Sequence, residues 1–296
     1  MKVLVTGAKG QLGADLVRRL KAEGIEAACF GSAELDVSDA DVVSGAVKKE
    51  RPGIIINCAA YTKVDLAEKE RLRAFAVNAV GAANLARSAK EAGARLIHVS
   101  TDFVFDGSSS TPYSETDGTN PLGVYGESKL AGEAEITSEL PEHVIVRTSW
   151  LYGVTGQNFV KTMLRLASER EALRVVYDQV GTPTWSADLA GVLVDISKAI
   201  SAGGSPWGAY HYSNEGVASW FDFTVAICEE AAALGASLKC STIDPIRTHE
   251  YPTPARRPAY SVMDKAKIKK TFGVKVPHWR VSLRNMLKEL YGGTHA

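Results

Sequence analysis

The chain has 296 residues, of which 45% are apolar and 23% are charged, an ordinary composition for a globular protein. Its 34 Lys and Arg residues balance its 34 Asp and Glu residues, and this neutral total argues against a general binder of nucleic acid or acidic membranes, because such proteins need a basic surplus. The total hides a split: residues 244–296 contain 11 basic and only 4 acidic side chains, so a negatively charged partner is expected at that end.

The first half of the chain alternates short apolar runs with amphipathic segments whose apolar residues recur about every 3.6 positions. The predicted strands are residues 2–6, 26–30, 54–58, 96–100 and 144–148. The predicted helices are residues 11–22, 39–50, 74–92 and 123–139. Continuously apolar strands separated by helices imply a parallel sheet that is covered on both faces. The expected fold is therefore α/β, with a doubly wound, Rossmann-like parallel sheet.

After residue 150 this rhythm loosens. The predicted elements are strands at residues 174–177 and 208–213, helices at residues 185–202 and 219–234, and a Pro-rich basic tail. We expect a first domain at residues 1–149, with its sheet completed by about residues 205–215. Residues 150–296 are expected to form mainly a smaller α/β lobe that is interleaved with the first domain and binds substrate.

A glycine-rich loop, TGAKGQLG at residues 6–13, follows the first strand and opens the first helix. Glycines at such a place allow a tight turn and let the backbone approach a pyrophosphate, while the helix N-terminus offers free N–H groups to the anion. Gly7, Gly10 and Gly13 are therefore predicted to bind a dinucleotide, which makes the first domain the NAD(P)-binding domain. The spacing is GxxGxxG and differs from the common GxGxxG, so the strand, loop and helix context carries the prediction.

The end of the second strand usually decides which nicotinamide cofactor binds, because an acidic residue there binds the ribose 2′-hydroxyl and repels a 2′-phosphate. The residues here are Phe30, Gly31 and Ser32. No carboxylate opposes a 2′-phosphate and no Arg attracts one, so the expected cofactor is NADPH or NADH. Asp36 could accept a hydrogen bond from the adenine amino group or belong to a helix N-cap region, and the sequence leaves both open.

A tyrosine and a lysine four residues apart, Tyr125 and Lys129, lie on one face of a predicted helix. An ammonium beside a phenol is expected to lower the phenol pKa from about 10 toward a value useful for acid catalysis. Thr101 lies at the carboxyl end of the fourth strand, where ligands bind in open parallel sheets, and its hydroxyl could hold a carbonyl oxygen beside Tyr125. These three residues are the predicted catalytic set.

Other polar residues are given structural interpretations. No pair among the six histidines has helical or ligand spacing, so no metal site is predicted, although a divalent metal at an oligomer interface stays open. The histidines are His98, His143, His211, His249, His278 and His295. The lysine run formed by Lys265, Lys267, Lys269 and Lys270 is expected to be a solvated helix face. Four tryptophans are expected to be packing anchors: Trp185, Trp207, Trp220 and Trp279.

The cell compartment follows from three features of the sequence. The four cysteines lack CxxC spacing, which favours free thiols and a reducing environment. The chain passes directly from Met1 and Lys2 into a strand, which leaves no room for a signal peptide, and no apolar stretch reaches the length of a membrane span. A cytoplasmic protein is expected, with no membrane and no nucleic-acid partner.

Beyond these patterns, the sequence resembles the extended short-chain dehydrogenases/reductases, and within them the dTDP-4-dehydrorhamnose reductases, over its full length. Superfamily motifs include ELDVSD at residues 34–39, CAAYTKVDLAE at 58–68, VNA at 77–79, STDFVFDG at 100–107 and YGESKLAGE at 125–133. The narrower family is indicated by RTSWLYG at residues 147–153, DQVGTPT at 178–184, YHYSNEGVASWFDF at 210–223 and ARRPAYSVMD at 255–264.

This resemblance implies reduction of the C4 ketone of dTDP-6-deoxy-L-lyxo-4-hexulose to dTDP-L-rhamnose by hydride from NADPH or NADH. A homodimer stays open. It implies that Tyr125 donates the proton, that Lys129 orients the cofactor ribose, and that Thr101 positions the carbonyl. The cofactor-binding residues implied by the resemblance are Gly7, Gly10, Gln11, Leu12, Gly13, Asp36, Val37, Ala59, Ala60, Tyr61, Tyr125 and Lys129. Asn78 is expected either to support the site or to make a contact at a helix start.

For the sugar nucleotide, the resemblance implies Thr101, Asp102, Phe103, Tyr125 and Trp150 around the hexose and Arg257 toward the phosphates. Many family members have Tyr where this chain has Phe103, so a hydroxyl contact is lost there. Related dehydratases carry Glu at that position for water elimination, and its replacement by Phe103 argues against a dehydratase.

Two other functions stay open at this stage. One is a 4-ketoreductase or epimerase acting on a different nucleotide sugar. The other is a non-catalytic, NADP-binding regulatory subunit of methionine adenosyltransferase, since similar chains serve as such partners. The presence of Thr101, Tyr125 and Lys129 argues against the regulatory subunit.

Overall fold

The computed structural model describes residues 1–292, so the expectation for His295 lies outside the described residues. Six parallel strands form the central sheet in the order β10-β5-β4-β3-β1-β2. They are β1 (Lys2–Thr6), β2 (Glu26–Phe30), β3 (Ile54–Asn57), β4 (Arg95–Thr101), β5 (His143–Thr148) and β10 (Gly208–His211). Because β2 and β3 lie on opposite sides of β1, the winding reverses there, and ligands bind at such a point. The predicted doubly wound parallel sheet is confirmed.

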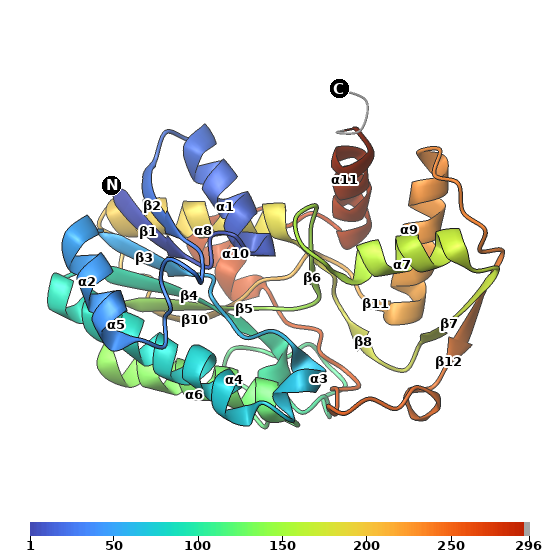
Figure 1. The fold of residues 1–296 in the computed structure, drawn as a ribbon, viewed down its shortest axis with the longest axis horizontal. Helices are drawn as coiled ribbons and strands as arrows, with labels where there is room; N and C mark the ends of the chain where they lie inside the picture. Colours follow the sequence, from blue (N-terminus) through green and yellow to red (C-terminus); the bar gives the residue numbers. More distant parts are fainter. Residues whose placement is uncertain (293–296) are drawn as a thin grey trace.

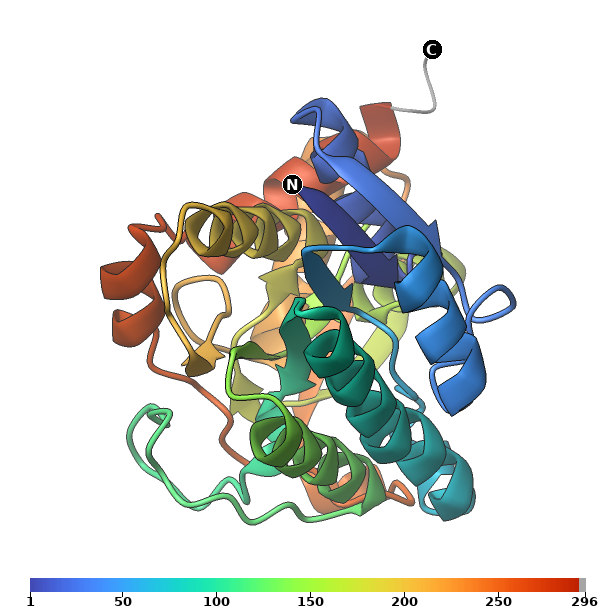
Figure 2. The same ribbon diagram turned by 90° about the vertical axis from the view of Figure 1, so that its left-hand side faces the viewer.

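Helices cover both faces of this sheet (Figure 2). One face carries α1 (Gln11–Ala22), α8 (Ser186–Ser201) and α10 (Ala266–Phe272), and the other carries α2 (Ala40–Glu50), α5 (Gly81–Ala92) and α6 (Val124–Glu139). Side chains alternate between the two layers: Val3 and Val5 pack with α1 and α8, whereas Leu4 packs with α2 and α5. All three are fully buried, which explains why the strands read as continuous apolar runs.

A second lobe lies beside the sheet, on the right in Figure 1. Its helices are α7 (Phe159–Glu169), α9 (Trp220–Ala233) and α11 (Trp279–Gly292). Its strand pairs are β7 (Ala172–Val176) with β12 (Thr242–Ile246), β6 (Leu151–Tyr152) with β9 (Thr184–Trp185), and β8 (Val180–Gly181) with β11 (Ala218–Ser219). Tyr152, Phe223 and Leu283 belong to its core. The chain leaves this lobe to form α8, β10 and α10 on the sheet, so the two parts are interleaved.

Several elements differ from the sequence expectations. The predicted helix at residues 74–92 is a longer helical run composed of α4 (Arg71–Phe75), a π-helix η1 (Ala76–Val80) and α5. The helices α3 (Val64–Ala67), α7 and α11 and the strand β12 were not predicted. A proline, Pro245, occupies the middle of β12, and such a residue argues against a strand unless the strand lies at a sheet edge. Two short 3-10 helices, η2 (Asp102–Val104) and η3 (Thr248–Glu250), complete the inventory.

The lysine run at α10 is only partly a solvated face. Lys265 is 6% exposed, its Nζ donates a hydrogen bond to the carbonyl of Met263 at 3.1 Å, and the same atom lies 3.7 Å from a carboxylate oxygen of Glu215. The expectation of a solvated side chain was therefore wrong for Lys265. None of the helices within residues 1–292 is long and apolar enough to span a bilayer.

Candidate active site

The carboxyl ends of the parallel strands bring the predicted site residues to one edge of the sheet. The glycine loop follows β1, residues 58–61 follow β3, Thr101 ends β4, and Trp150 comes two residues after β5. Thr101 pairs in register with Thr148, the last residue of β5. This edge is where a doubly wound sheet binds ligands.

The glycine loop has a shape that suits a dinucleotide. Gly7 has φ of +64°, and a Cβ at this position would lie 2.6 Å from the backbone nitrogen of Ala59 in the loop after β3. Gly10 is the N-cap of α1, and no side chain caps that helix, which leaves the N–H groups of its first turn available to an anion. Leu12 and Gly13 are buried in the first turn. The residues present therefore fit a bound pyrophosphate.

The end of β2 holds a carboxylate that the sequence reasoning missed. Glu34 accepts a hydrogen bond from the backbone N–H of Gly31 at 2.9 Å and forms an ion pair with Lys9 of the glycine loop. The hydrogen bond with Lys9 lowers the pKa of Glu34. Glu34 lies four residues beyond the strand, outside Phe30, Gly31 and Ser32, the positions from which cofactor preference was predicted. The turn at Gly31 returns its carboxylate to the end of β2.

Asp36 has a structural role at the start of α2. Its Oδ1 accepts hydrogen bonds from both the backbone N–H and the hydroxyl of Ser38, at 2.9 Å and 2.7 Å. The helix itself is capped by Asp39, which accepts from the N–H groups of Asp41 and Val42. Asp36 thus shapes the turn before α2, and its contact with adenine stays a prediction. Val37, beside it, is buried.

Asn78 supports the site from the π-helix. Its Oδ1 accepts from the backbone N–H of Tyr61 at 2.8 Å, and its Nδ2 donates to the carbonyl of Tyr61 at 3.1 Å and to the hydroxyl of Ser128 at 3.0 Å. Ser128 lies in α6 between Tyr125 and Lys129. A single buried amide therefore joins the loop after β3, which contains Ala59 and Ala60, to the helix that carries the predicted catalytic pair.

Thr101, Asp102, Phe103 and Tyr125 meet where β4 passes into η2. The hydroxyl of Thr101 acts on that of Tyr125 and favours its ionised form, and the Phe103 ring meets the Tyr125 ring edge to face with centroids 5.5 Å apart. Gly126 makes this approach possible, because a Cβ there would lie 2.2 Å from the carbonyl oxygen of Phe103. The glycine after the tyrosine in YGESK thus lets α6 press its phenol against Thr101.

Asp102 is buried and incompletely hydrogen-bonded. Its Oδ1 accepts from the Thr101 hydroxyl at 3.0 Å, whereas Oδ2 has no partner at hydrogen-bond geometry among the described residues, although the nearby Ser261 hydroxyl favours the ionised carboxylate. Burial raises the pKa of Asp102 to about 6. A buried acceptor without a partner is rare in proteins, and a hydroxyl of a bound ligand would satisfy it.

The pKa of Tyr125 differs from the sequence expectation. Burial raises it to about 12, against a smaller opposite effect from the hydrogen bond with Thr101. Lys129 does not lower it here, because burial reduces the pKa of Lys129 itself to about 8 and its Nζ donates to the carbonyl of Val99 at 2.7 Å. The expected lowering of the tyrosine pKa was therefore wrong for this structure. The phenol is protonated at neutral pH, which is the form that can donate a proton.

Trp150 is held by an aromatic stack. Its φ is +46°, a region that bulky residues rarely adopt and that occurs most often at functional sites. The indole stacks on that of Trp220 with centroids 3.5 Å apart and planes 5° apart, and Trp220 Nε1 donates to Gln179 Oε1 at 3.2 Å. The packing interpretation of Trp220 thus agrees with its contacts, and the residue it packs on is a predicted site residue.

Arg257 is already paired in the structure. Its Nη2 donates to Asp65 Oδ2 at 2.8 Å and its Nη1 donates to Thr253 Oγ1 at 2.7 Å. Asp65 lies in α3, four residues after Tyr61, so Arg257 crosses from the basic end of the chain to the edge of the sheet. Its predicted contact with phosphates is not tested by this geometry.

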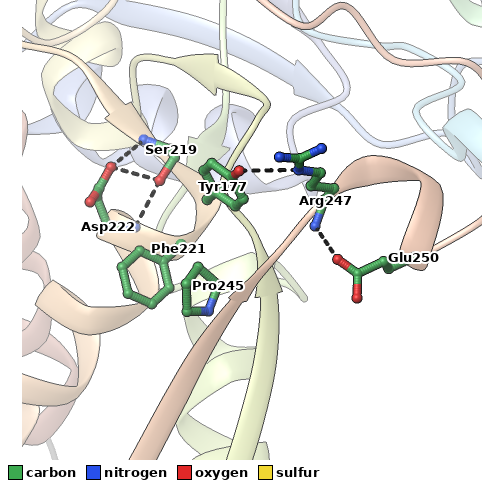
Figure 3. A pocket seen from close by; sticks show the side chains of 7 residues that line it. All are labelled: Tyr177, Ser219, Phe221, Asp222, Pro245, Arg247 and Glu250. Atoms are coloured by element: carbon green, nitrogen blue, oxygen red, sulfur yellow. Dashed lines mark hydrogen bonds between the residues drawn. The ribbon is translucent and has the colours of Figure 1, made fainter.

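A separate pocket of about 590 Å³ opens on the second lobe, between β7, β12 and the start of α9 (Figure 3). Its lining includes Tyr177, whose hydroxyl accepts a hydrogen bond from Arg247 Nε at 3.3 Å. None of the predicted site residues lines this pocket. Within residues 1–292, no three His, Cys, Asp or Glu side chains gather closely enough to hold a metal ion.

Comparisons with known proteins add the family. The family model described as "RmlD substrate binding domain" matches residues 1–291. A dTDP-4-dehydrorhamnose reductase from Aggregatibacter actinomycetemcomitans is 44% identical over 96% of this chain and 98% of its own length.

Two solved structures bear the same enzyme name. The one from Clostridium acetobutylicum has a TM-score of 0.92 and 39% identity, covering 98% of this chain and 100% of that chain. The one from Bacillus anthracis, solved in complex with NADP, has a TM-score of 0.90 and 42% identity, covering 97% of this chain and 99% of that chain.

Proposed function

The chain belongs to the RmlD family of extended short-chain dehydrogenases/reductases, and from this membership we propose that it is an NADPH- or NADH-dependent reductase of the C4 ketone of dTDP-4-dehydrorhamnose, forming dTDP-L-rhamnose. The observation that carries the proposal is the nearly full-length match to reductases together with the Thr101 and Tyr125 pair at the sheet edge. The match favours this function over the other nucleotide-sugar reaction and over the regulatory subunit.

The nicotinamide cofactor supplies the hydride when bound, held by Gly7, Gly10 and Gly13 at the start of α1. As a ketone is reduced, negative charge develops on its oxygen, and donors already aimed at that oxygen stabilise the transition state more than the ground state. Tyr125 gives its proton to this oxygen, and the Thr101 hydroxyl hydrogen-bonds to it. Lys129 lies one helical turn after Tyr125 and is assigned to the cofactor ribose.

The hexose is assigned to the space bounded by Asp102, Phe103 and Trp150. The unpartnered Oδ2 of Asp102 offers an acceptor for a sugar hydroxyl, and the flat indole of Trp150 offers an apolar face. Phe103 occupies the place of the glutamate that a dehydratase would need. We assign residues 1–149 with β10 to cofactor binding, and most of residues 150–296 to the sugar nucleotide.

The decisive experiment is product identification after incubating the protein with dTDP-4-dehydrorhamnose and each nicotinamide. UDP- and GDP-linked 4-keto sugars offered in parallel separate this reductase from one for another nucleotide sugar. Formation of dTDP-L-rhamnose supports the proposal. Absence of any cofactor oxidation with all three substrates would favour the regulatory subunit.

Tyr125→Phe provides the test of mechanism. Loss of the proton donor is expected to lower kcat by about 10³-fold, since general acid catalysis contributes about 10² to 10⁴-fold. The affinity for NADPH, measured by fluorescence, is expected to stay unchanged. Tyr113→Phe is a matched control, because that buried tyrosine bonds Asp106 at 3.1 Å. Unchanged turnover in Tyr125→Phe would rule out the assigned role.

The compartment and assembly are also proposals. All four cysteines are free thiols, as is usual in reducing compartments, and we assign the enzyme to the cytoplasm on that basis. The homodimer and a metal at its interface stay predictions, which sedimentation with and without a chelator would test.

A further inference from the structure

A fully buried histidine lies directly behind the predicted catalytic lysine. His98 is in β4, three residues before Thr101, and its exposed fraction is 0%, while that of Lys129 is 1%. The imidazole Nε2 is 3.0 Å from Lys129 Nζ, and its Nδ1 is 2.9 Å from the amide nitrogen Nδ2 of Asn57 in β3. The ring thus joins a side chain of β3 to a side chain of α6.

The neighbours of Asn57 fix where the imidazole proton lies. Asn57 Oδ1 accepts from the backbone N–H of Ala59 at 3.0 Å and from the hydroxyl of Thr6 at 2.6 Å. A backbone N–H can only donate, so Oδ1 must face Ala59 and the donor Nδ2 must face His98. The facing nitrogen, Nδ1, is therefore the acceptor. A neutral imidazole then carries its proton on Nε2, the atom that faces Lys129.

This tautomer constrains the charge of Lys129. An ammonium has three donors and no acceptor, so it would place an N–H against the Nε2–H of His98. A neutral amine avoids the conflict, because its lone pair accepts from Nε2–H while one of its own N–H groups donates to the carbonyl of Val99 at 2.7 Å. Only the neutral amine satisfies every hydrogen-bonding atom in this buried row, which consists of Asn57, His98 and Lys129.

The surrounding charges agree with this arrangement. Burial, with a smaller effect of Lys129, holds the pKa of His98 well below its usual range, so the ring stays neutral. The groups whose charge acts on Lys129 are Glu133 on α6 and Cys58 after β3, and both favour the ammonium. Glu133 favours the ammonium, but its carboxylate is bound by Arg147, with the closest contact at 2.7 Å.

Two other groups near this row carry no opposing charge. Burial raises the pKa of the Cys58 thiol to about 12, so this thiol is uncharged. His143 of β5 faces His98 from the neighbouring strand, and its effect is to lower the pKa of His98 further. Burial thus outweighs the groups that favour the ammonium, and the pKa of Lys129 falls to about 8, so the uncharged amine predominates above that pH.

We propose that His98 is a positioning residue for Lys129: its imidazole holds the lysine side chain against the end of β4 and favours the uncharged amine. An ammonium would have to leave this hydrogen bond, so the position of Nζ and its charge are coupled. The inference rests on the proposed function only for the role of Lys129 near the cofactor. It adds to that function a residue that controls when Lys129 is charged.

The test is a titration of the protein without cofactor or sugar, so its outcome does not depend on the proposed reaction. The ¹³Cε signal of Lys129, assigned by its absence in Lys129→Met, is followed against pH in protein labelled with ¹³C-lysine. The expected midpoint is about 8. In His98→Gln the side-chain carbonyl can accept from an ammonium, and the midpoint is expected to rise by about one pH unit or more.

His143→Gln is the matched control. It replaces another buried histidine, whose Nδ1 faces the carbonyl of Leu140 rather than a lysine, and the midpoint for Lys129 is expected to stay unchanged. A midpoint near the ordinary lysine value of about 10.4 in the unmodified protein would overturn the proposal. An identical midpoint in His98→Gln would also overturn it.

A second measurement keeps the proposal testable if His98→Gln does not fold. Long-range ¹H–¹⁵N spectra of the unmodified protein distinguish a protonated from an unprotonated ring nitrogen. The proposal requires a proton on Nε2 and none on Nδ1 of His98 at a pH above the Lys129 midpoint of about 8, where the amine predominates. The opposite tautomer, or a doubly protonated ring, would overturn it.

Discussion

Arg257 is held in place by two neighbouring side chains. Its Nη2 and Nη1 donate to Asp65 and Thr253, respectively. The Arg257 side chain is 24% exposed. Because the guanidinium is planar, these two hydrogen bonds fix the direction of its remaining N–H donors, and fixed N–H donors suit recognition of a phosphate group. The partner carboxylate therefore serves to orient this cation.

Arg257→Ala is expected to raise the KM for the sugar nucleotide by about tenfold or more, because a lost charge-assisted hydrogen bond to phosphate weakens binding by roughly that factor. The KM for NADPH is expected to change little. Steady-state kinetics with each substrate varied in turn measure the difference. The exposed neighbour Arg256 provides the control variant, Arg256→Ala. Equal effects of Arg257→Ala on both KM values would remove Arg257 from the sugar-nucleotide site.

Glu34 and Lys9 place opposite charges at the end of β2, where the cofactor's adenosine ribose is expected. The carboxylate disfavours a 2′-phosphate and the ammonium favours one. Glu34→Gln is therefore expected to raise the preference for NADPH over NADH on the order of fivefold, whereas Lys9→Gln is expected to lower it. The ratio of kcat/KM for the two cofactors is the measurement, and an unchanged ratio in both variants would contradict this account.

Among the elements, the helical run from α4 to α5 shows what a local pattern can and cannot predict. The apolar spacing in residues 74–92 correctly indicates helix, since both α- and π-turns bury one face. Within the π-turn at Ala76–Val80, Asn78 accepts a hydrogen bond from the backbone of Tyr61, 17 positions earlier in the chain. No window of sequence around Asn78 contains that partner, so the single helix was the natural prediction.

The residues of the candidate site also divide into those that a local sequence motif predicts and those that it does not. Thr101, Tyr125 and Lys129 could be predicted because each lies in a local motif whose position in the fold follows from strand order. Their supports could not: His98 lies 31 positions from Lys129, and Trp220 lies 70 positions from Trp150. From the sequence alone, a histidine inside an apolar run is interpreted as a core residue. Its contact with Lys129 becomes evident only when the position of α6 is known.

Helices α9 and α11 are joined by a carboxylate that predicts acid sensitivity. Glu230, 7% exposed in its side chain, accepts from Arg284 Nε at 2.7 Å and from Arg280 Nε at 2.8 Å. The hydrogen bond from Arg284 lowers the pKa of Glu230 to about 2. A lowered carboxyl pKa stabilises the fold above its ordinary value of 4.5, and the stabilisation is lost as pH falls toward about 2.

Glu230→Gln is therefore expected to lower the free energy of unfolding by about 2 kcal/mol near neutral pH, because charge-assisted hydrogen bonds are lost. The variant should also lose less stability than the unmodified protein on acidification through this range. Denaturant unfolding at a series of pH values measures both effects. Glu229→Gln is the control, since that exposed carboxylate pairs only with Arg280 Nη2 at 2.5 Å. Parallel pH curves for Glu230→Gln and the unmodified protein would contradict the prediction.

Over the whole molecule, folding accounts for part of the charge split in the sequence. In the described residues, basic side chains of the last 53 positions pair with acids from earlier in the chain. These pairs are Arg257 with Asp65, Lys265 and Lys269 with Glu215, Arg280 with Glu229 and Glu230, and Arg284 with Glu230. The protein's own acidic residues thus neutralise some of these cations, and Arg257 is the cation of this segment that the resemblance assigns to a ligand.

The two parts of the molecule are joined next to the cofactor loop. Asn158, the N-cap of α7, accepts from Lys161 N at 3.1 Å and donates to Gln11 Oε1 at 2.8 Å and to the carbonyl of Gly153 at 2.7 Å. Gln11 in turn donates to the carbonyl of Leu151 at 3.0 Å. The first residue of α1 is therefore tied to the second lobe at two points, and the parts are expected to unfold together.

Asn158→Asp separates this connection from helix capping, because aspartate keeps the cap acceptor and loses both donated bonds. The oxygens of half-buried Gln11 and buried Gly153 then lose their partner, which is expected to destabilise the second lobe by about 1–3 kcal/mol. All five tryptophans lie at or after position 150, so their fluorescence reports mainly on that lobe, whereas circular dichroism reports on the whole chain. In the unmodified protein the two denaturation curves are expected to coincide, because the lobes unfold as one. In Asn158→Asp the fluorescence transition should move to lower denaturant than the dichroism transition, and coincident transitions there would show that the lobes are held together by the shared sheet alone.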